Sequence, residues 1–467
     1  MNGEASRKAD VSATLANHVI HTTYEDIPPE VVAVTKRTIL DILSVAVAGT
    51  TAYSSNLLVD LIKGWGGKEE STILCYDTKV PAMHAAMANA TMGRALDYMD
   101  RYDPVETLVG VTIVPAAFAI AEKRGMVSGK DFIAAVTLGL DIIPRMALAT
   151  KGNLKGWSGQ AVFGYFGVAA TGGKLLGLSE KQIVDAFGIA YSQAAGNHQS
   201  MKDGALSKRL STGFAAKGGI LAALLAEKGF SGGANSMEGP WGFYNLYIDG
   251  DYDPSQLTIE LGKRFEGANI SVKAYPCCSH THTGIDATLD IISRHDIVPE
   301  QVGAVKAGVN ARGYDLSCDP IERKRKPITI VDAQFNLPYA IATAIVDREV
   351  NINNFTEKMI TRRQVLKMMQ KIEPYVDNEL ENMTHGAISP CKLEIITTNG
   401  AVYQMQVSHS KGSPQNPMTQ EELNRKVWDC MDYAAKSLSK DTVHKVIDLV
   451  NELEKIDDVA VIMKLLN

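Results

Sequence analysis

The sequence has few cysteines, few aromatic residues and no large excess of charge of either sign. Only six of its 467 residues are cysteines, and aromatic residues make up 7% of the chain. So few cysteines in so long a chain do not form the disulfide framework of a small secreted domain. The net charge is −6, and the one basic run is the short stretch at 322–326. We therefore expect no nucleic-acid partner, because nucleic-acid surfaces normally carry a clustered basic excess.

Long apolar segments and targeting signals are also missing. No continuous apolar run approaches the roughly 20 residues of a membrane span. The N-terminal stretch has no apolar core after its basic residues, as a secretory signal would have. We therefore expect a cytoplasmic protein with no membrane partner.

Helical patterns dominate the first 265 residues. Apolar residues recur at helical spacing in 28–49, 128–149 and 178–196, and serine caps precede the last two of these segments. The stretch 159–178 is rich in glycine and alanine, which is typical of a helix buried on most sides. No GxGxxG motif follows a predicted strand, so no nucleotide-binding loop is expected.

The pattern changes near residue 268. Segment 302–312 alternates apolar and polar residues like a strand, and 392–409 forms two such runs joined by Asn399-Gly400, a strong hairpin signal. Helical sequence returns with a capping box at Thr419 and Glu422. We therefore predict a mostly α protein, in which 1–268 plus 411–467 form a large all-helical domain and 269–410 form an inserted, smaller α+β lid domain. A crevice between two such domains is a natural ligand site.

Two polar clusters in the first half of the chain are candidates for chemistry. Segment 93–107 carries Asp97, Asp100, Asp103 and Glu106. Carboxylates crowded together can act as acids or bases, although a solvated loop with helix caps gives the same pattern. Lys208 and Arg209 precede a helix of small residues and could hold a substrate carboxylate. An exposed basic pair is the alternative.

The third cluster is the segment 271–291, which combines Lys273, Cys277, Cys278, His280 and His282. It could be a metal site, a redox pair or part of an acid–base pocket. Adjacent cysteines rarely bridge each other or share one metal, and no second His/Cys group follows at ligand spacing. An acid–base role for Lys273 and a histidine fits better, with no metal.

The segment KAYPCCSHTHTGIDATLDI, at 273–291, resembles the K-x-Y-P-x-C-x-x-x-H-x-x-I-D-A segment of the MmgE/PrpD family. That family includes 2-methylcitrate dehydratase, cis-aconitate decarboxylase and iminodisuccinate epimerase. Further similar segments follow in the family's order and cover nearly the whole chain: ALDYMD at 95–100, and the segments 114–122, 166–196, 207–232, 332–350 and 411–427.

The resemblance implies a helical domain built from both chain ends, an α+β lid and a homodimer. It also implies cofactor-free chemistry, in which a proton is moved at a carbon next to a carboxylate of a small di- or tricarboxylate. Loss of water, loss of CO2 or return of the proton then follows. Such chemistry needs cationic groups for the substrate carboxylates and a positioned base.

The residues implied to act are carried over one by one. Lys208 matches the lysine of the family's T-K-x-L-H segment, Lys273 and His282 match the first lysine and last histidine of the K-x-Y-P segment, and Asp97 and Asp100 match two acids of the A-L-D-F-D-D-T-H segment. We expect Lys273, His282, Lys208, Asp97 and Tyr102 to be catalytic. Substrate binding is expected to involve Lys208, Arg209, Lys273, Ser158 and Asp100.

Several family histidines are replaced. Leu108, Ser158, Ser211 and Tyr102 stand where the family carries histidine, and Cys278 stands where the decarboxylases can carry another. Losing one acid–base group typically costs about 10²–10⁴ in rate. Two hypotheses follow: a lyase or isomerase with altered substrate or chemistry, or an inactive homologue that binds a carboxylate.

Overall fold

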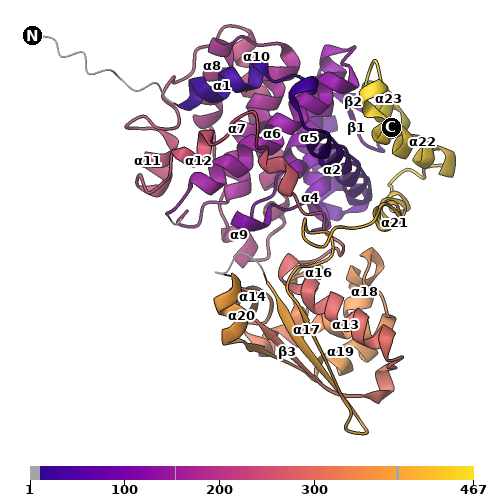
Figure 1. Cartoon of the computed structure of the whole chain (residues 1–467). Helices are drawn as coiled ribbons and strands as arrows, with labels where there is room; N and C mark the ends of the chain where they lie inside the picture. Colours follow the sequence, from indigo (N-terminus) through magenta and orange to yellow (C-terminus); the bar gives the residue numbers. More distant parts are fainter. Residues whose placement is uncertain (1–10, 153, 385–388) are drawn as a thin grey trace, which may run out of the picture. The chain divides into compact units, whose positions relative to one another are not determined.

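A computed structural model describes residues 11–152, 154–384 and 389–467 of the chain (Figure 1). The chain divides into two compact units. Unit 1 comprises the residues up to Ala95, Asp100–Ile270 and Cys430–Asn467, and unit 2 comprises Leu96–Met99 and Ser271–Asp429. The predicted fold class, mostly α with a smaller α+β region, is confirmed.

Unit 1 is built from helices that pack against one another around an apolar core. Its longer helices are α1 (Val11–His21), α2 (Pro29–Ala48), α3 (Tyr53–Trp65), α4 (Ala82–Ala95), α5 (Gly110–Arg124), α6 (Gly129–Ala149), α7 (Gly159–Leu176), α8 (Glu180–Tyr191), α10 (Leu210–Glu227) and α22 (Lys440–Asn451).

The predicted caps and the close packing in unit 1 are confirmed. Ser128 accepts a hydrogen bond from the backbone N–H of Asp131, and Ser179 caps α8 in the same way through Gln182. These side chains satisfy N–H groups that lack partners within the helix. Helix α7 is buried along most of its length. A Cβ on Gly219 of α10 would lie 2.5 Å from the Cβ of Val168 on α7, so glycine is required for this approach.

One small sheet in unit 1 was not predicted. Strands β1 (Ser71–Ile73) and β2 (Thr78–Val80) form an antiparallel hairpin within the stretch expected to be helical. Strands of three residues are too short for an alternating pattern to be recognised. A glutamate of α5 anchors the hairpin, because Glu122 accepts hydrogen bonds from both the N–H and the hydroxyl of Thr72, each at 2.7 Å.

Helix α6 is long and apolar enough to span a membrane by length and composition alone, although charged residues interrupt its apolar sequence. Its most apolar 18-residue window is 94% buried inside the protein. The helix also contains Asp141 and Arg145, both fully buried and paired with each other. It is therefore the central core helix of unit 1.

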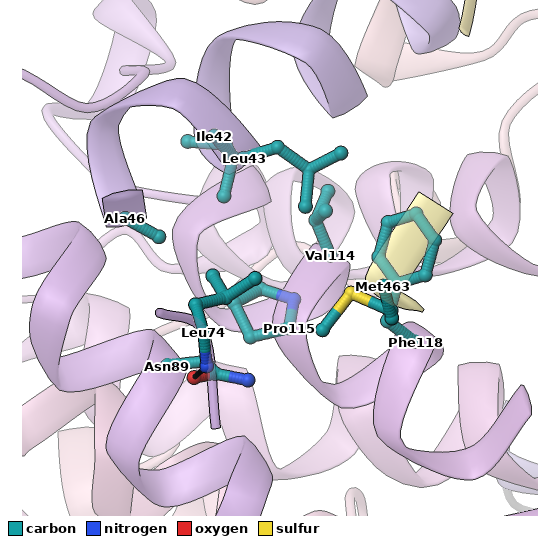
Figure 2. A pocket seen from close by; sticks show the side chains of 9 residues that line it. All are labelled: Ile42, Leu43, Ala46, Leu74, Asn89, Val114, Pro115, Phe118 and Met463. Atoms are coloured by element: carbon teal, nitrogen blue, oxygen red, sulfur yellow. Dashed lines mark hydrogen bonds between the residues drawn. The ribbon is translucent and has the colours of Figure 1, made fainter. Parts of the chain in front are cut away.

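A gap in the core of unit 1 lies between α2, α5 and the β1 hairpin (Figure 2). Its volume is about 10 Å³, and apolar side chains such as Leu43, Val114 and Phe118 converge on it. The polar residue at its edge, Asn89, is occupied by hydrogen bonds to the backbone of Thr72 and Leu74. So small and apolar a space holds at most one water molecule, so it is a packing defect and not a substrate site.

Unit 2 contains a four-stranded sheet in the order β4-β3-β5-β6. Strand β3 (Val302–Val309) pairs in parallel with β4 (Ile372–Val376) and antiparallel with β5 (Cys391–Thr397), which continues into β6 (Val402–Val407). The strand at 302–312 and the hairpin at Asn399-Gly400 are thus confirmed. Gly400 has φ = 87°, a left-handed conformation that glycine adopts without strain.

Helices cover one face of this sheet. Helix α13 (His282–Arg294) packs on β5 and β6, and α17 (Leu337–Asp347) packs on β4 and α13 (Figure 1). Side chains from these helices and from alternate positions of β5, such as Leu393 and Ile395, form a separate apolar core. Unit 2 therefore holds its own framework, and the segment before α13 is fixed against it.

The extent of unit 2 differs from the predicted lid of 269–410. Residues 411–429 belong to unit 2, because the chain there pairs with the segment before and within α13. The N–H of Val272 donates to the carbonyl of Gly412, and the N–H of Lys411 donates to Asp286. Residues 96–99 also belong to unit 2 and form a four-residue excursion from unit 1. Contacts between residues distant in sequence decide these limits.

Candidate functional site

Asp97 directly follows α4 in the turn that joins unit 2. Its φ of 57° lies in the left-handed region, which aspartate tolerates better than most residues other than glycine. The side chain is buried, with 2% of the residue exposed. The backbone therefore holds the carboxylate of Asp97 in one place inside unit 2.

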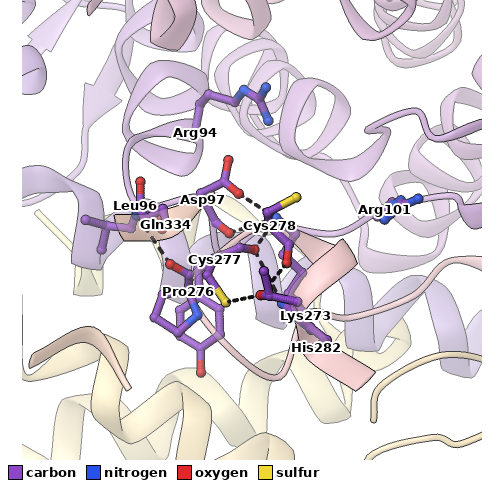
Figure 3. A network of polar contacts seen from close by, with 12 residues as sticks. Arg94, Leu96, Asp97, Arg101, Lys273, Pro276, Cys277, Cys278, His282 and Gln334 are labelled. Carbon is purple, nitrogen blue, oxygen red and sulfur yellow. Dashed lines mark hydrogen bonds and ion pairs between the residues drawn. The ribbon is translucent and has the colours of Figure 1, made fainter. Parts of the chain in front are cut away.

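Lys273 forms a buried ion pair with Asp97 (Figure 3). Its ammonium lies 2.8 Å from Asp97 Oδ2, 2.9 Å from the carbonyl oxygen of Asp97 and 2.9 Å from that of Cys277. These three acceptors match the three N–H donors of an ammonium group. The sequence-predicted residues Asp97 and Lys273, 176 positions apart, are thus in direct contact.

His282 lies close to this pair, at the first position of α13. Its Nε2 is 3.3 Å from the carbonyl oxygen of Cys277, the same oxygen that accepts from Lys273. Because a carbonyl can only accept, this contact places the proton on Nε2. The ring also meets the ring of Tyr275 edge to face, at 5.1 Å between centroids. Tyr275 in turn donates to Asp286 at 2.7 Å, so the histidine is held by a chain of polar contacts.

The two adjacent cysteines of this segment do not form a redox pair. Cys277 and Cys278 are both buried, and neither is in a disulfide. Burial raises the pKa of the Cys277 thiol to about 12, so it stays protonated at neutral pH. Among the described residues, no group of three or more His, Cys, Asp or Glu side chains is arranged to hold a metal ion.

Lys208 and Arg209 lie in unit 1, in the short 3-10 helix η4 (Leu206–Arg209) that leads into α10. Both are buried, with 6% and 5% of the residue exposed, so they are not an exposed basic pair. Arg209 donates to the backbone carbonyl of Arg94, itself a buried cation at the end of α4. Cations are costly to bury, so such groups are normally hydrogen-bonded or paired within the fold.

Asp100 accepts hydrogen bonds from three successive N–H groups at the start of α5. Its carboxylate lies 3.2 Å from the N of Val109, 2.7 Å from that of Gly110 and 2.9 Å from that of Val111. Burial raises the pKa of Asp100 to about 6, and the backbone N–H groups oppose this shift. Asp100 therefore supports the N-terminus of a helix within unit 1, and its binding role remains a prediction.

Tyr102 lies in the same turn, and its hydroxyl donates to Glu266 Oε2 at 2.6 Å. Burial and the neighbouring Glu266 raise the pKa of the Tyr102 hydroxyl well above its usual range. Proton transfer from this group is correspondingly unfavourable at neutral pH, and its catalytic role remains a prediction.

Ser158, Leu108 and Ser211, at positions where the family carries histidine, also lie in unit 1. Ser158 precedes α7 and is 1% exposed, and its hydroxyl has no hydrogen-bond partner among the described residues. Leu108 is buried, and the hydroxyl of Ser211 donates to the carbonyl of Lys208. None of the three supplies a proton-transferring imidazole.

The structure thus brings Asp97, Lys273 and His282 together in unit 2, and it places Lys208 beside Arg209 in unit 1. Sequence reasoning missed two buried residues that contact the Asp97 segment, Lys426 and Gln334. A signal for Lys426 was present. It shares the buried face of α21 (Gln420–Met431) with apolar residues, where a lysine is unusual: Leu423, Val427 and Cys430.

The pH dependence of stability tests the environment of Asp100. Between about pH 4 and 6 the folded state holds this proton while the unfolded chain has released it, so the free energy of unfolding falls as pH rises. A pKa raised from 3.8 to about 6 corresponds to about 3 kcal/mol. The stability of wild type minus that of D100N, from urea unfolding, should be larger at pH 4 than at pH 7 by up to this amount. A difference that does not change with pH would contradict it.

Comparison with known proteins gives the same family for both halves of the chain. Residues 13–255 match the MmgE/PrpD N-terminal domain, and residues 275–455 match the MmgE/PrpD C-terminal domain. The chain is 26% identical to the cis-aconitate decarboxylase of Aspergillus terreus, over 100% of this chain and 98% of that protein. It is 27% identical to the human cis-aconitate decarboxylase, over 92% of this chain and 89% of that protein. The Aspergillus oryzae cis-aconitate decarboxylase-like protein oryM is 26% identical over 99% of this chain and 98% of its own length. Both halves match the same family in order, and the chain belongs to the MmgE/PrpD family.

Proposed function

We propose that this protein is a cofactor-independent lyase or isomerase that moves a proton next to a carboxylate of a small di- or tricarboxylate. Family membership and the cis-aconitate decarboxylase relatives support an enzyme of the lyase type. The observation that carries the proposal is the buried contact between Asp97 and Lys273, at positions that match the family motifs. The residues Leu108, Ser158 and Ser211, which stand where the resemblance implies histidines, support an altered substrate or an altered chemistry.

The chemistry needs a base and stabilised negative charge. In our proposal the Asp97 carboxylate takes the proton from the carbon next to the substrate carboxylate. Lys273 stabilises the enolate-like charge that develops, and His282 acts as an acid–base or orienting residue. Carboxylate binding by Lys208 and Arg209 of unit 1 stays a prediction. The proton then returns to carbon, or water or CO2 leaves.

The contacts of Lys273 set a condition on this mechanism. Its three N–H groups already have acceptors within unit 2, two of them backbone carbonyls. A substrate oxygen would therefore replace one of these carbonyls. Exchanging a neutral carbonyl for an anionic substrate oxygen strengthens the hydrogen bond of the ammonium, because hydrogen bonds in which both groups are charged are stronger.

A second candidate function is carboxylate binding without turnover. It is favoured by Leu108, Ser158 and Ser211, whose side chains transfer no proton at neutral pH. In that case the buried cations of unit 1 would still bind an anion, while the reaction would lack part of its acid–base equipment. We further propose that the protein acts in the cytoplasm as a homodimer, with the small carboxylate as its partner and no nucleic acid or membrane.

Proton NMR in D2O separates the two candidates. The protein is incubated with cis-aconitate, 2-methylcitrate and an epimerisable amino dicarboxylate, each at millimolar concentration. Deuterium at the carbon next to the carboxylate, or a new product, supports the enzyme. Saturable binding with neither exchange nor product across the panel supports the binding homologue. Stoichiometric zinc or iron in the purified protein would contradict the cofactor-free proposal.

A further inference from the structure

Three successive backbone carbonyls around Asp97 accept hydrogen bonds from three different side chains of unit 2. The carbonyl of Leu96 accepts from Gln334 at 2.8 Å, that of Asp97 from Lys273 at 2.9 Å, and that of Tyr98 from Lys426 at 2.9 Å. All three donor side chains are nearly fully buried. This excursion has no helix or strand to satisfy its carbonyls, so side chains supply the donors.

Each of these donors also bonds to the segment 273–277. Gln334 Nε2 lies 3.3 Å from the carbonyl of Pro276 (Figure 3), Lys273 bonds to the carbonyl of Cys277, and Lys426 lies 2.9 Å from the carbonyl of Lys273. The two chain segments that carry Asp97 and Lys273 are therefore joined at three consecutive points. Only the central point contains the ion pair itself.

Lys426 is the more informative of the two outer residues. Only 2% of it is exposed, and its ammonium lies 4.0 Å from the centroid of the Tyr98 ring, a cation–π distance. Burying an ammonium on an otherwise apolar helix face is costly, and an apolar side chain there would avoid that cost. The hydrogen bonds to the two carbonyls and the contact with the Tyr98 ring therefore account for a lysine at this position.

We infer that Lys426 and Gln334 are positioning residues that hold the side chains of Asp97 and Lys273 in contact with each other and in the positions that the reaction needs. They act through the backbone of 96–98 and of 273–276. This inference rests on the proposed function only for its catalytic consequence. Its structural content is that removing either side chain loosens both segments while the rest of unit 2 stays folded.

The experiment uses full-length K426M, K426R and Q334L, with K371M as the matched control. Lys371 also donates to a backbone carbonyl in unit 2, that of Val302, and among the described residues its side chain forms no hydrogen bond or ion pair with residues 96–99 or 273–277. Hydrogen–deuterium exchange followed by mass spectrometry reports on peptides that cover 94–101 and 271–279. Steady-state kinetics on the substrate identified in D2O give kcat and KM.

K426M and Q334L should increase exchange in both peptides, and K371M and K426R should not. For a misplacement of about 1 Å we expect kcat/KM to fall about 10²-fold, mostly in kcat, in K426M. K426R should restore part of this activity, because it keeps the charge, the donors and a cation that can stack on the Tyr98 ring, although the planar guanidinium is larger than the ammonium that it replaces.

Unchanged exchange in both peptides of K426M and Q334L would overturn the inference, as would an equal loss of kcat/KM in K371M. Increased exchange together with a wild type that turns nothing over would support the positioning role and reject the lyase proposal instead. If K426M does not fold, Q334L decides the matter by the same measurements, with K371M as its control.

Discussion

Replacing Lys273 with methionine should lower the free energy of unfolding by about 3–5 kcal/mol, as is typical when one partner of a buried ion pair is removed. The loss arises because the Asp97 carboxylate is left without its cation in a site where only 2% of the residue is exposed. The carbonyl of Asp97 also loses the hydrogen bond from Lys273, and the carbonyl of Cys277 keeps only its contact with His282. In the proposed reaction the same change removes the cation beside the base. The activation free energy of turnover should therefore rise by at least as much as the free energy of unfolding falls. Urea unfolding and the D2O assay measure the two effects.

Two further variants separate charge from packing. K273M/D97N removes both charges and keeps a residue that tolerates the left-handed conformation at position 97, so it should recover part of the lost stability, because no uncompensated charge is left buried. K411M is the matched control, since Lys411 pairs with Glu422 at 3.0 Å but both side chains are 32% exposed. We expect it to cost about 0–1 kcal/mol. Equal losses in K273M and K411M would mean that the Asp97–Lys273 contact is not a buried pair in solution.

Substitution of Arg145 in unit 1 should destabilise the protein as much as substitution of Lys273. It is fully buried on α6, donates to Asp141 at 2.7 Å and to the carbonyl of Ile259 at 2.8 Å, and also bonds to the carbonyl of Arg264. R145M leaves the Asp141 carboxylate without its cation, so we expect a loss of about 3–5 kcal/mol in the free energy of unfolding. Asp141 also accepts a hydrogen bond from the N–H of Glu266, and Glu266 accepts one from Tyr102. R145M should therefore also destabilise the turn that carries Tyr102.

The controls for Arg145 follow the same logic. R145M/D141N removes the uncompensated charge and should be more stable than R145M. K151M removes an ion pair of unit 1 whose lysine is 59% exposed, and should change stability by about 0–1 kcal/mol. If R145M unfolds at the same urea concentration as wild type, the buried network of α6 does not stabilise unit 1.

Local signals in the sequence predicted the elements that depend on local chemistry. Ser128, Ser179 and Thr419 cap helices because a side-chain oxygen meets nearby N–H groups, and Asn399-Gly400 forms a hairpin because glycine adopts a left-handed conformation. Lys273 and Asp97 were recognised because the family motif marks them. Their direct contact across 176 positions could not be derived, since no local pattern encodes it.

The remaining features depend on the fold as a whole. Lys208 and Arg209 have the same sequence pattern whether they are exposed or buried. Only the packing of η4 and α10 determines that they are buried. The carbonyls of 96–98 have no side-chain signature, so the residues that bind them, Gln334 and Lys426, were missed. The chain around Gly412 pairs with Val272, far away in sequence, and no local pattern encodes this contact.

The four-residue excursion at 96–99 has a consequence for how the chain is completed during synthesis. Residues 100–270 emerge from the ribosome after residues 96–98 and before any of the side chains that donate to the carbonyls of 96–98. Lys273, Gln334 and Lys426 then emerge in that order, so the carbonyls of Asp97, Leu96 and Tyr98 gain these donors one at a time. Unit 1 receives its last segment, Cys430–Asn467, only after all of unit 2 has been made. Neither unit can therefore finish folding as an independent N-terminal piece, and translation stalled before Lys426 would leave the Tyr98 carbonyl without its lysine.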